Sequence, residues 1–190
     1  MSDKAARKRE LILGTAKEIF KEKGFKAVTM KDIAEACEIS RGGLYLYFDS
    51  TESILKECLN AESHIKRNTD ETPGDALVQF LNDEKKSILG EEDSLLSALY
   101  EYLFFAPEDS DIRKTVQKLD EEKLSYVKSL LDAGADSGEL YCDDSELAAK
   151  NILYTLDGLR INKKTLGISE TDVDKTLLYT LSGFIVDEEA

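Results

Sequence analysis

The sequence has few of the residues on which metal sites, hydrolytic triads and disulfide frameworks depend. His64 is the single histidine, which excludes a multi-histidine metal site and leaves one possible base for Ser-His-Asp catalysis. The three cysteines, Cys37, Cys58 and Cys142, are odd in number and widely spaced. We therefore expect them to be small buried side chains in a reducing cytoplasm. We expect no metal site and no cofactor.

Long apolar runs and prolines are also scarce. No stretch approaches the roughly 18–20 apolar residues that a membrane helix needs, and the charged N-terminus lacks the apolar core of a signal peptide. Only two prolines, Pro73 and Pro107, and eleven glycines occur in 190 residues, which disfavours a loop-rich β sandwich. These absences predict a cytoplasmic protein with no membrane partner.

Positive charge is low overall but unevenly distributed. The formal net charge is −14, which by itself argues against a polyanion as partner. Residues 1–50, however, carry ten basic and eight acidic residues, whereas the other 140 residues carry 15 and 31. A nucleic-acid partner therefore stays open for the N-terminal quarter only.

Apolar residues recur at helical spacing almost throughout, so we predict an all-α protein. The only ambiguous strand pattern is at 140–142, and the polar stretch 68–75, with its Pro-Gly pair, predicts a loop. Thr29, Ser40 and Ser50 are predicted N-caps. The expected helices are one that ends at Lys23, then 30–37, 41–48, one that carries Ile54 to Ile65, and 75–89, 94–105, 111–133, 145–166 and 172–186.

The segment from Thr29 to Leu55 is the most informative part of the chain. Two short helices joined by a turn at 38–40 are spaced to pack against the first helix, which is the usual way to present a helix to the DNA major groove. The second helix begins with Gly42 and Gly43 in its first turn, each of which costs a helix about 1 kcal/mol relative to alanine. Glycines there are useful where the backbone must approach another surface closely. Arg41 and the hydroxyls of Tyr45 and Tyr47 can contact bases or phosphates.

Residues 10–55 resemble the DNA-binding domain of the tetracycline-repressor (TetR) family of bacterial regulators. The residues that carry the resemblance are Ala16, Phe20, Gly24, Phe25, Thr29, Ile33, Ala34, Ser40, Leu44, Tyr45, Phe48 and Leu55. The resemblance implies a helix-turn-helix DNA-binding domain at 1–50 and a helical ligand-binding and dimerisation domain at 51–190. It also implies that the DNA contacts are made by Thr29, Lys31, Ser40, Arg41, Gly42, Gly43, Tyr45, Leu46 and Tyr47.

One residue in the turn departs from the family pattern. The family usually has glycine where this chain has Glu38, so we expect either strain at Glu38 or a slightly different turn. Lys4, Arg7, Lys8 and Arg9 form a basic run near the N-terminus that can add phosphate contacts. A solvated surface run is the alternative interpretation.

The last two helices carry apolar stripes wide enough for burial on more than one side. By resemblance, they pair across a two-fold axis as a four-helix bundle in a homodimer. The residues assigned to that interface are Ile152, Leu156, Leu159, Leu177, Leu181 and Phe184; ordinary intrachain core is the alternative. A two-fold dimer presents two recognition helices about 34 Å apart, which predicts double-stranded DNA with an inverted-repeat operator.

The middle of the chain is rich in aromatic residues, and in the family this region surrounds a small-molecule effector. The candidate pocket residues are Phe80, Tyr100, Phe104, Tyr126 and Tyr154, although aromatics at helical spacing are also typical of a plain core. Glu101 and its acidic surroundings point to a cationic ligand. The effector itself is not identified by the sequence.

The function that these observations favour is a DNA-binding regulator, a repressor released from its operator by a small molecule. The alternative is an all-α carrier or enzyme in which the N-terminal helices are only structural. No nucleophile, base and orienting group surround His64, and the chain has no Gly-rich phosphate loop, which disfavours an enzyme.

Overall fold

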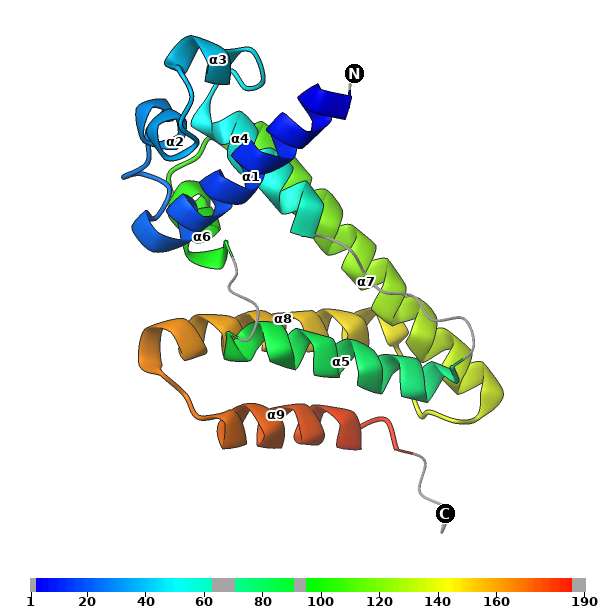
Figure 1. The fold of residues 1–190 in the computed structure, drawn as a ribbon. Coiled ribbons are helices and arrows are strands. Elements are labelled where there is room, and N and C mark those ends of the chain that lie inside the picture. The colour runs from blue at the N-terminus through cyan, green and yellow to red at the C-terminus, as the bar shows by residue number, and fades with distance from the viewer. Residues whose placement is uncertain (1–2, 63–70, 91–94, 186–190) are drawn as a thin grey trace. The chain divides into compact units, whose positions relative to one another are not determined.

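The computed structural model describes residues 3–62, 71–90 and 95–185 (Figure 1). Within these ranges the structure is helical, and its helices carry the labels α1 to α9. They are α1 (Asp3–Lys23), α2 (Met30–Ala36), α3 (Arg41–Tyr45), α4 (Thr51–Glu62), α5 (Pro73–Leu89), α6 (Leu96–Leu103), α7 (Asp111–Ser137), α8 (Ser145–Leu166) and α9 (Glu170–Ser182). His64, Ile65, Ser94 and Val186 lie outside the described residues, as do residues 68–70 of the expected loop. None of the described helices combines the length and apolarity that a membrane span requires.

Side-chain caps fix several of the helix starts that the sequence predicts. The hydroxyl of Thr29 accepts a hydrogen bond from the Asp32 amide, and the Asp32 carboxylate accepts one from the Thr29 amide, so α2 begins with a capping box. Ser40 caps α3, and Ser50 accepts from the Ser53 amide at the start of α4. These bonds satisfy amides that have no partner inside the helix.

The chain folds into two compact units, each with its own core. Unit 1 consists of Met1–His64 and Asp93–Leu119, and unit 2 of Ile65–Glu92 and Asp120–Ala190. Unit 1 therefore continues past residue 50, because α4 and α6 contribute Ile54, Leu55 and Ala98 to the core beneath the first three helices. In unit 2, α5 packs against α8 and α9 around a second apolar cluster.

Two predicted helix boundaries are wrong, and both errors involve glycine. The Pro73-Gly74-Asp75 segment is the first turn of α5 and not a loop, because proline is tolerated at N1 and Thr72 caps the helix. Helix α7 continues through Gly134 to Ser137. Gly134 is needed there because a Cβ would lie 2.5 Å from the Cδ1 atom of Leu140, which folds back over it.

Two other elements are shorter than expected, and the strand-like stretch is minimal. α3 ends at Tyr45 although Phe48 still packs beneath it, and α9 spans only Glu170–Ser182. The ambiguous pattern at 140–142 corresponds to a single antiparallel bridge between Leu140 and Ile185.

Candidate functional site

Helix α3 lies at the outer edge of unit 1 and is held from below by two buried side chains (Figure 1). Leu44 is fully buried and Phe48 is 3% exposed, in the core shared with α1, α2 and α4. Leu46, by contrast, is 84% exposed and Tyr45 is 52% exposed. The buried side chains thus hold this five-residue helix against the core, while the opposite face of the helix is exposed to solvent.

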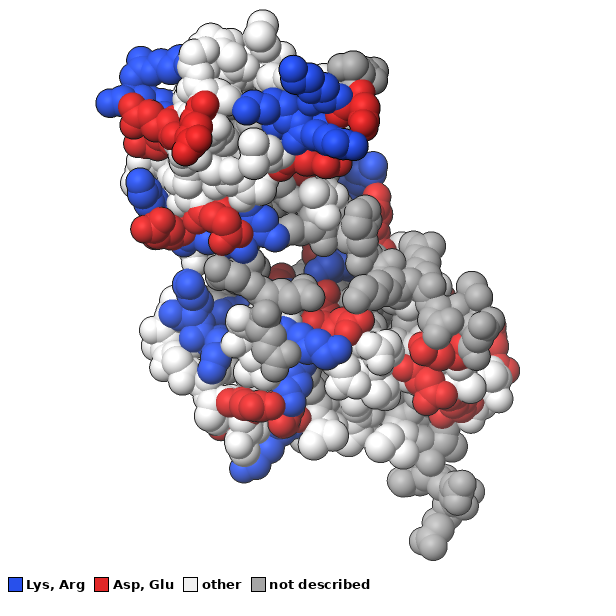
Figure 2. Space-filling view, viewed as in Figure 1, with Lys and Arg blue, Asp and Glu red and all other residues white. Residues whose placement is uncertain are grey.

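The sequence-predicted DNA contacts all lie on α2, on α3 or in the residues that directly flank them. Seven of the nine are exposed and two, Gly43 and Tyr47, are half-buried. In Figure 2, Lys and Arg side chains flank an uncharged area at the α3 edge of unit 1, with acidic side chains interspersed. Among the described residues, Arg41 has no hydrogen-bond or ion-pair partner, whereas Lys31 pairs with Glu35 at 3.5 Å. The structure therefore brings the predicted contacts together on one exposed side of unit 1.

The two glycines of α3 differ in their surroundings. A Cβ on Gly43 would lie 3.2 Å from the Oγ atom of Ser40, whose hydroxyl caps the helix by accepting from the Gly43 amide at 3.0 Å. Around Gly42, nothing lies within 4 Å of the place that a Cβ would take. Packing within the chain therefore explains Gly43 but gives no reason for glycine at position 42.

The turn between α2 and α3 contains the strain expected from its departure from the family pattern. Glu38 has φ = 54°, in the left-handed region, and is the only described residue other than glycine with a positive φ. The Ile39 amide donates to the Ala34 carbonyl at 3.0 Å, so the end of α2 is a Schellman motif with Glu38 at the position that glycine usually takes.

Arg9 anchors the base of α3 instead of extending toward solvent. Its guanidinium pairs with Glu57, donates to the carbonyl of Tyr47 at 3.0 Å and lies 4.3 Å from the ring centroid of Phe48. Of the basic run near the N-terminus, Arg9 is therefore committed to structure, while Lys4 and Arg7 are exposed.

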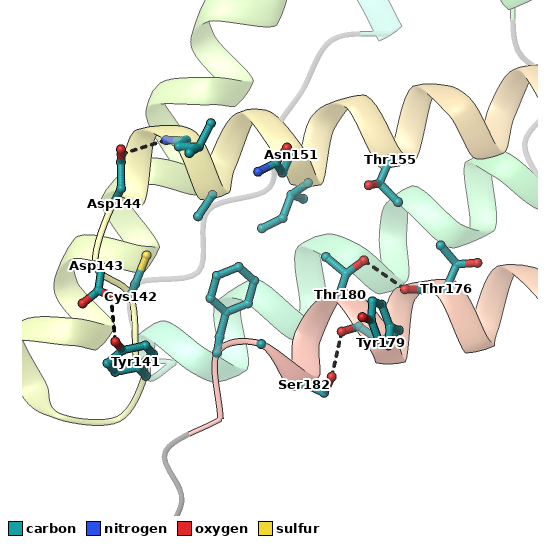
Figure 3. Close-up of a pocket in the computed structure, with 15 residues that line it drawn as sticks. Tyr141, Cys142, Asp143, Asp144, Asn151, Thr155, Thr176, Tyr179, Thr180 and Ser182 are labelled. Atoms are coloured by element: carbon teal, nitrogen blue, oxygen red, sulfur yellow. Dashed lines mark hydrogen bonds between the residues drawn. The ribbon is translucent and has the colours of Figure 1, made fainter.

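A side groove is the larger of two described hollows, and it lies entirely in unit 2. Its volume is about 670 Å³, and it runs between α8 and α9 beside the segment 141–144 (Figure 3). Leu147, Asn151 and Thr155 line it from α8, and Thr176 and Tyr179 from α9. The hydroxyls of Thr176 and Thr180 each donate to the carbonyl four residues earlier, so both are satisfied within α9.

Unit 2 also contains a cluster of partly buried charged side chains. Glu84 on α5 forms ion pairs with Lys123 on α7 and with Arg160 on α8. The Lys123 ammonium donates to Glu84 Oε1 at 2.9 Å, and Arg160 donates to Asp157 Oδ1 at 2.8 Å. Burial lowers the pKa of Lys123 and lowers the pKa of Arg160 to about 10.

Comparison with known proteins identifies the family. A model of the tetR family of bacterial regulatory proteins matches residues 12–58, and a model of the tetracyclin repressor-like C-terminal domain matches residues 76–174. The HTH-type transcriptional regulator YfiR of Bacillus subtilis is 30% identical over 169 residues, which cover 85% of this chain and 82% of YfiR. The chain belongs to the TetR family. It is a DNA-binding transcriptional regulator.

Solved structures agree with the TetR fold. A TetR transcription regulator from Haloarcula marismortui superposes with a TM-score of 0.80 at 20% identity, over 94% of this chain and 96% of that one. The regulator AibR, solved in complex with isovaleryl coenzyme A and operator DNA, superposes with a TM-score of 0.71 at 17% identity. That match covers 94% of this chain and all of AibR.

The aromatic residues that the TetR resemblance assigned to an effector pocket do not form one set. Tyr100 and Phe104 belong to unit 1, whereas Phe80, Tyr126 and Tyr154 belong to unit 2. Phe80 and Tyr126 pack edge to face with centroids 5.9 Å apart, while Phe104 and Tyr154 are 81% and 67% exposed. None of the five lines either described hollow. Periodicity does not reveal which helices share a unit, and the residues that line the effector pocket stay a prediction.

Glu101 makes a local contact within unit 1 and also lines the smaller described hollow. It lies on α6 in unit 1, where its Oε2 atom accepts a hydrogen bond from the Lys26 amide at 3.2 Å. The cationic ligand that Glu101 suggests stays a prediction.

Four of the residues assigned to the TetR dimer interface are core residues of unit 2. Ile152, Leu156, Leu159 and Leu177 are at most 7% exposed, and they pack with Val127 and Leu131 of α7. Leu181 and Phe184 are half-buried against the same cluster. The structure thus places these residues in the core of unit 2, which is the alternative stated for them, and the residues of the dimer interface stay a prediction.

The opposite face of α8 carries apolar residues that the sequence analysis did not assign to the dimer interface. Leu147, Tyr154 and Ile161 recur every seven residues and are 56%, 67% and 43% exposed. On α9, Leu178 and Tyr179 are 65% and 83% exposed. The seven-residue spacing was the available signal, but the stronger buried stripe on the same helix obscured it.

Among the described residues, no group of histidine, cysteine and carboxylate side chains is arranged to hold a metal.

Proposed function

We propose that this TetR-family protein is a repressor that binds an inverted-repeat operator as a homodimer and leaves it when a small molecule binds unit 2. The observation that carries the proposal is the arrangement at α3, where Leu44 and Phe48 fix the helix from below and Arg41, Tyr45 and Leu46 point away from the core. A helix held in that way can enter the major groove without unfolding its support.

The contacts follow from this geometry. Arg41 is suited to a guanine edge or a phosphate, and the exposed hydroxyl of Tyr45 to a phosphate oxygen. Thr29 and Lys31 at the start of α2, together with Ser40, Gly42, Gly43, Leu46 and Tyr47, complete the DNA surface. Gly42 has free space within the chain, which supports close approach of the backbone to DNA at that position.

The dimer face is revised from the original assignment. We assign it to the exposed stripe Leu147, Tyr154 and Ile161 of α8 together with Leu178 and Tyr179 of α9, with the α8–α9 groove as part of it. A two-fold interface places the same patch of both subunits in contact, so each exposed side chain meets its counterpart surface. Gly158, one turn after Tyr154, leaves room for a close approach of the second copy.

Regulation requires that an effector binds one arrangement of the protein better than another. The coupling between effector and operator cannot exceed the difference in effector affinity between those two arrangements. The family model of the C-terminal half, named for the tetracyclin repressor, supports repression, and the acyl-coenzyme A and operator in the AibR complex support a ligand-gated operator. We assign no catalytic activity to the chain, and we place it in the cytoplasm, where its DNA is.

The decisive test is a pair of substitutions that affect folding and DNA binding in opposite ways. Gly42→Ala should leave the fold intact and stabilise α3, by up to about 1 kcal/mol, because alanine is the better helix former. The same substitution should weaken binding to an inverted repeat upstream of the protein's own gene at least tenfold, as measured by fluorescence anisotropy. Arg41→Ala and Tyr45→Ala should also lose binding while circular dichroism is unchanged.

A matched control lies on the buried side of the same helix. Leu44→Ala should lower the free energy of unfolding by about 2–5 kcal/mol, so it loses DNA binding through loss of structure. If Gly42→Ala and Arg41→Ala bind like the parent, the contact assignment is incorrect. If the parent binds no inverted repeat at low salt, the carrier interpretation replaces the repressor.

A further inference from the structure

The ion cluster inside unit 2 is unusual in its charge balance. The side chains of Glu84 and Arg160 are each 13% exposed, and that of Lys123 is 32% exposed. Lys123 and Arg160 come from different helices, α7 and α8, and both converge on the single carboxylate of Glu84 on α5. The less exposed part of the cluster therefore has two cations and one carboxylate.

The carboxylates that balance the second cation lie nearer to solvent. Asp157 pairs with Arg160 but is 46% exposed, and Asp120, which acts on Lys123 through space, is exposed. Burial raises the pKa of Asp157, with the charge of Asp120 as a further cause. Among the less exposed charged groups between α5, α7 and α8 the cations thus outnumber the carboxylates, and Asp157 and Asp120, nearer to solvent, supply the balancing negative charge.

Stability alone does not account for this cluster. Taking charged groups out of water costs several kcal/mol per ion, and a well-packed apolar set of similar volume is often as stable or more so. The lowered pKa values of Lys123 and Arg160 reflect that cost. Charged groups with perturbed pKa values are enriched at binding sites, so this cluster is a candidate ligand-binding site.

Apolar side chains border the cluster on the same three helices. Phe80 precedes Glu84 by one turn of α5, and Tyr126 follows Lys123 by three residues on α7. Their rings meet edge to face, with centroids 5.9 Å apart, and Leu156, one turn before Arg160, is buried beside them in the same apolar cluster. A ligand that fits this environment has an anionic head and an apolar body.

We propose that the effector of this regulator is an apolar organic acid whose carboxylate replaces that of Glu84 between Lys123 and Arg160. This inference rests on the proposed ligand-gated function and names the ligand class. The acid's tail enters between Phe80 and Tyr126, which separates their rings. Because Glu84 then loses both partners, ligand binding releases α5 from α7 and α8, and this change is the differential interaction that shifts the conformational population.

The first measurement uses defined probes on the full chain. Octanoate and benzoate are titrated against octan-1-ol and octyltrimethylammonium, with the melting temperature and operator anisotropy as readouts. We expect the two acids to raise the melting temperature and to weaken operator binding at least tenfold, because a ligand stabilises the state to which it binds. The neutral and cationic octyl compounds should do neither at the same concentrations.

Substitutions within the cluster separate a ligand site from a structural ion pair. Arg160→Met and Lys123→Met should each lower the affinity for the acids at least tenfold. Glu84→Gln removes the competing carboxylate but keeps a hydrogen-bond acceptor, so it should raise acid affinity about tenfold. A merely structural cluster predicts no gain of affinity from Glu84→Gln.

Lys85 provides a matched control on the same helix. It pairs with Glu170 and Asp174 of α9 and is 23% exposed, so Lys85→Met removes an equal charge outside the cluster and should leave the acid response unchanged. The inference is overturned if neither acid shifts the melting temperature, if octyltrimethylammonium acts instead, or if Glu84→Gln does not gain affinity. If the parent still binds its operator in any of those cases, the DNA-binding function stands and only the ligand inference fails. If the parent does not bind the operator, the proposed function itself fails.

Discussion

The carboxylate of Glu101 lies directly over the backbone of Gly24. It also accepts a hydrogen bond from the amide of Lys26, two residues further along the chain. Its Oε2 atom is 2.6 Å from the place that a Cβ on residue 24 would take, and it accepts from the Lys26 amide at 3.2 Å. Gly24 also has φ = +75° and closes α1 through its amide, which donates to the Phe20 carbonyl at 2.9 Å. Helix α6 is thus tied to the segment that leads from α1 into the helix-turn-helix.

Substitution of Gly24 tests this contact. Gly24→Ala should destabilise unit 1 by about 1–2 kcal/mol through the left-handed backbone conformation, with an added cost because Glu101 must move. In a Glu101→Ala background the added cost disappears, so the coupling energy between the two sites should be about 0.5–1 kcal/mol. Urea unfolding of the four proteins in the cycle gives the result, and additive effects would contradict the contact.

The strained turn residue makes a prediction of the opposite sign. Glu38→Gly should stabilise the protein by about 1 kcal/mol. A residue with a Cβ costs roughly 1–2 kcal/mol in the left-handed conformation, and part of the gain from removing the Cβ is offset because glycine loses more conformational entropy on folding. The expected rise in melting temperature is about 2–4 °C for a chain of this size. Glu38→Ala keeps the Cβ and should show no such gain. A gain with alanine equal to that with glycine would show that the carboxylate, and not φ, is the source of strain.

The revised dimer face can be tested by adding charge to it. Tyr154→Arg places a cation in the middle of the exposed α8 stripe. In the proposed two-fold interface this cation would face its counterpart, so we expect a shift from dimer to monomer in sedimentation at micromolar concentration. Glu121→Arg, an exposed site on α7, is the control and should remain dimeric. Since operator binding needs both recognition helices, the monomeric variant should also lose at least tenfold in operator affinity. A parent that sediments as a 21.2 kDa species would reject the dimer.

The two capping boxes predict a dependence of stability on low pH. Hydrogen bonds from Thr29 lower the pKa of Asp32, and hydrogen bonds from Ser169 lower the pKa of Asp172, both from 3.8. A carboxylate with a lowered folded pKa contributes stability that is complete above its unfolded value and is lost as pH falls through the folded value. Urea unfolding below pH 3.8 should therefore show a steeper loss for the parent than for the Asp32→Asn, Asp172→Asn double variant. Equal slopes would indicate that the boxes do not persist in solution.

The sequence predicted the helices best where a cap marks their start. Thr29, Ser40 and Ser50 stand where the structure has N-caps, because the side-chain oxygen that satisfies a free amide is visible in the sequence itself. The errors at Pro73 and Gly134 arose because both residues are breakers in isolation and only their neighbours, Thr72 and Leu140, make them helical. The residues predicted to contact DNA lie together on an exposed side of unit 1 because they belong to one local motif.

The rest of the site depends on contacts between distant segments, which spacing does not encode. Leu156 and Tyr154 belong to the same helix and differ by two positions, yet one is in the core and the other is 67% exposed. The pairing of Glu84 with Lys123 and Arg160 joins three helices, and each residue alone resembles an ordinary surface charge. Such features become visible only when α5, α7 and α8 are assembled.

The short length of α3 has a genetic consequence. A helix of five residues has almost no stability of its own. Helix α3 is therefore stabilised by the packing of Leu44 and Phe48 against the core side chains beneath them. A selection for mutants that no longer silence their target promoter should therefore return more alleles in these buried supporting residues than in the few exposed residues proposed to contact DNA. Operator recognition therefore depends on the core residues of unit 1 as well as on the exposed residues of α3.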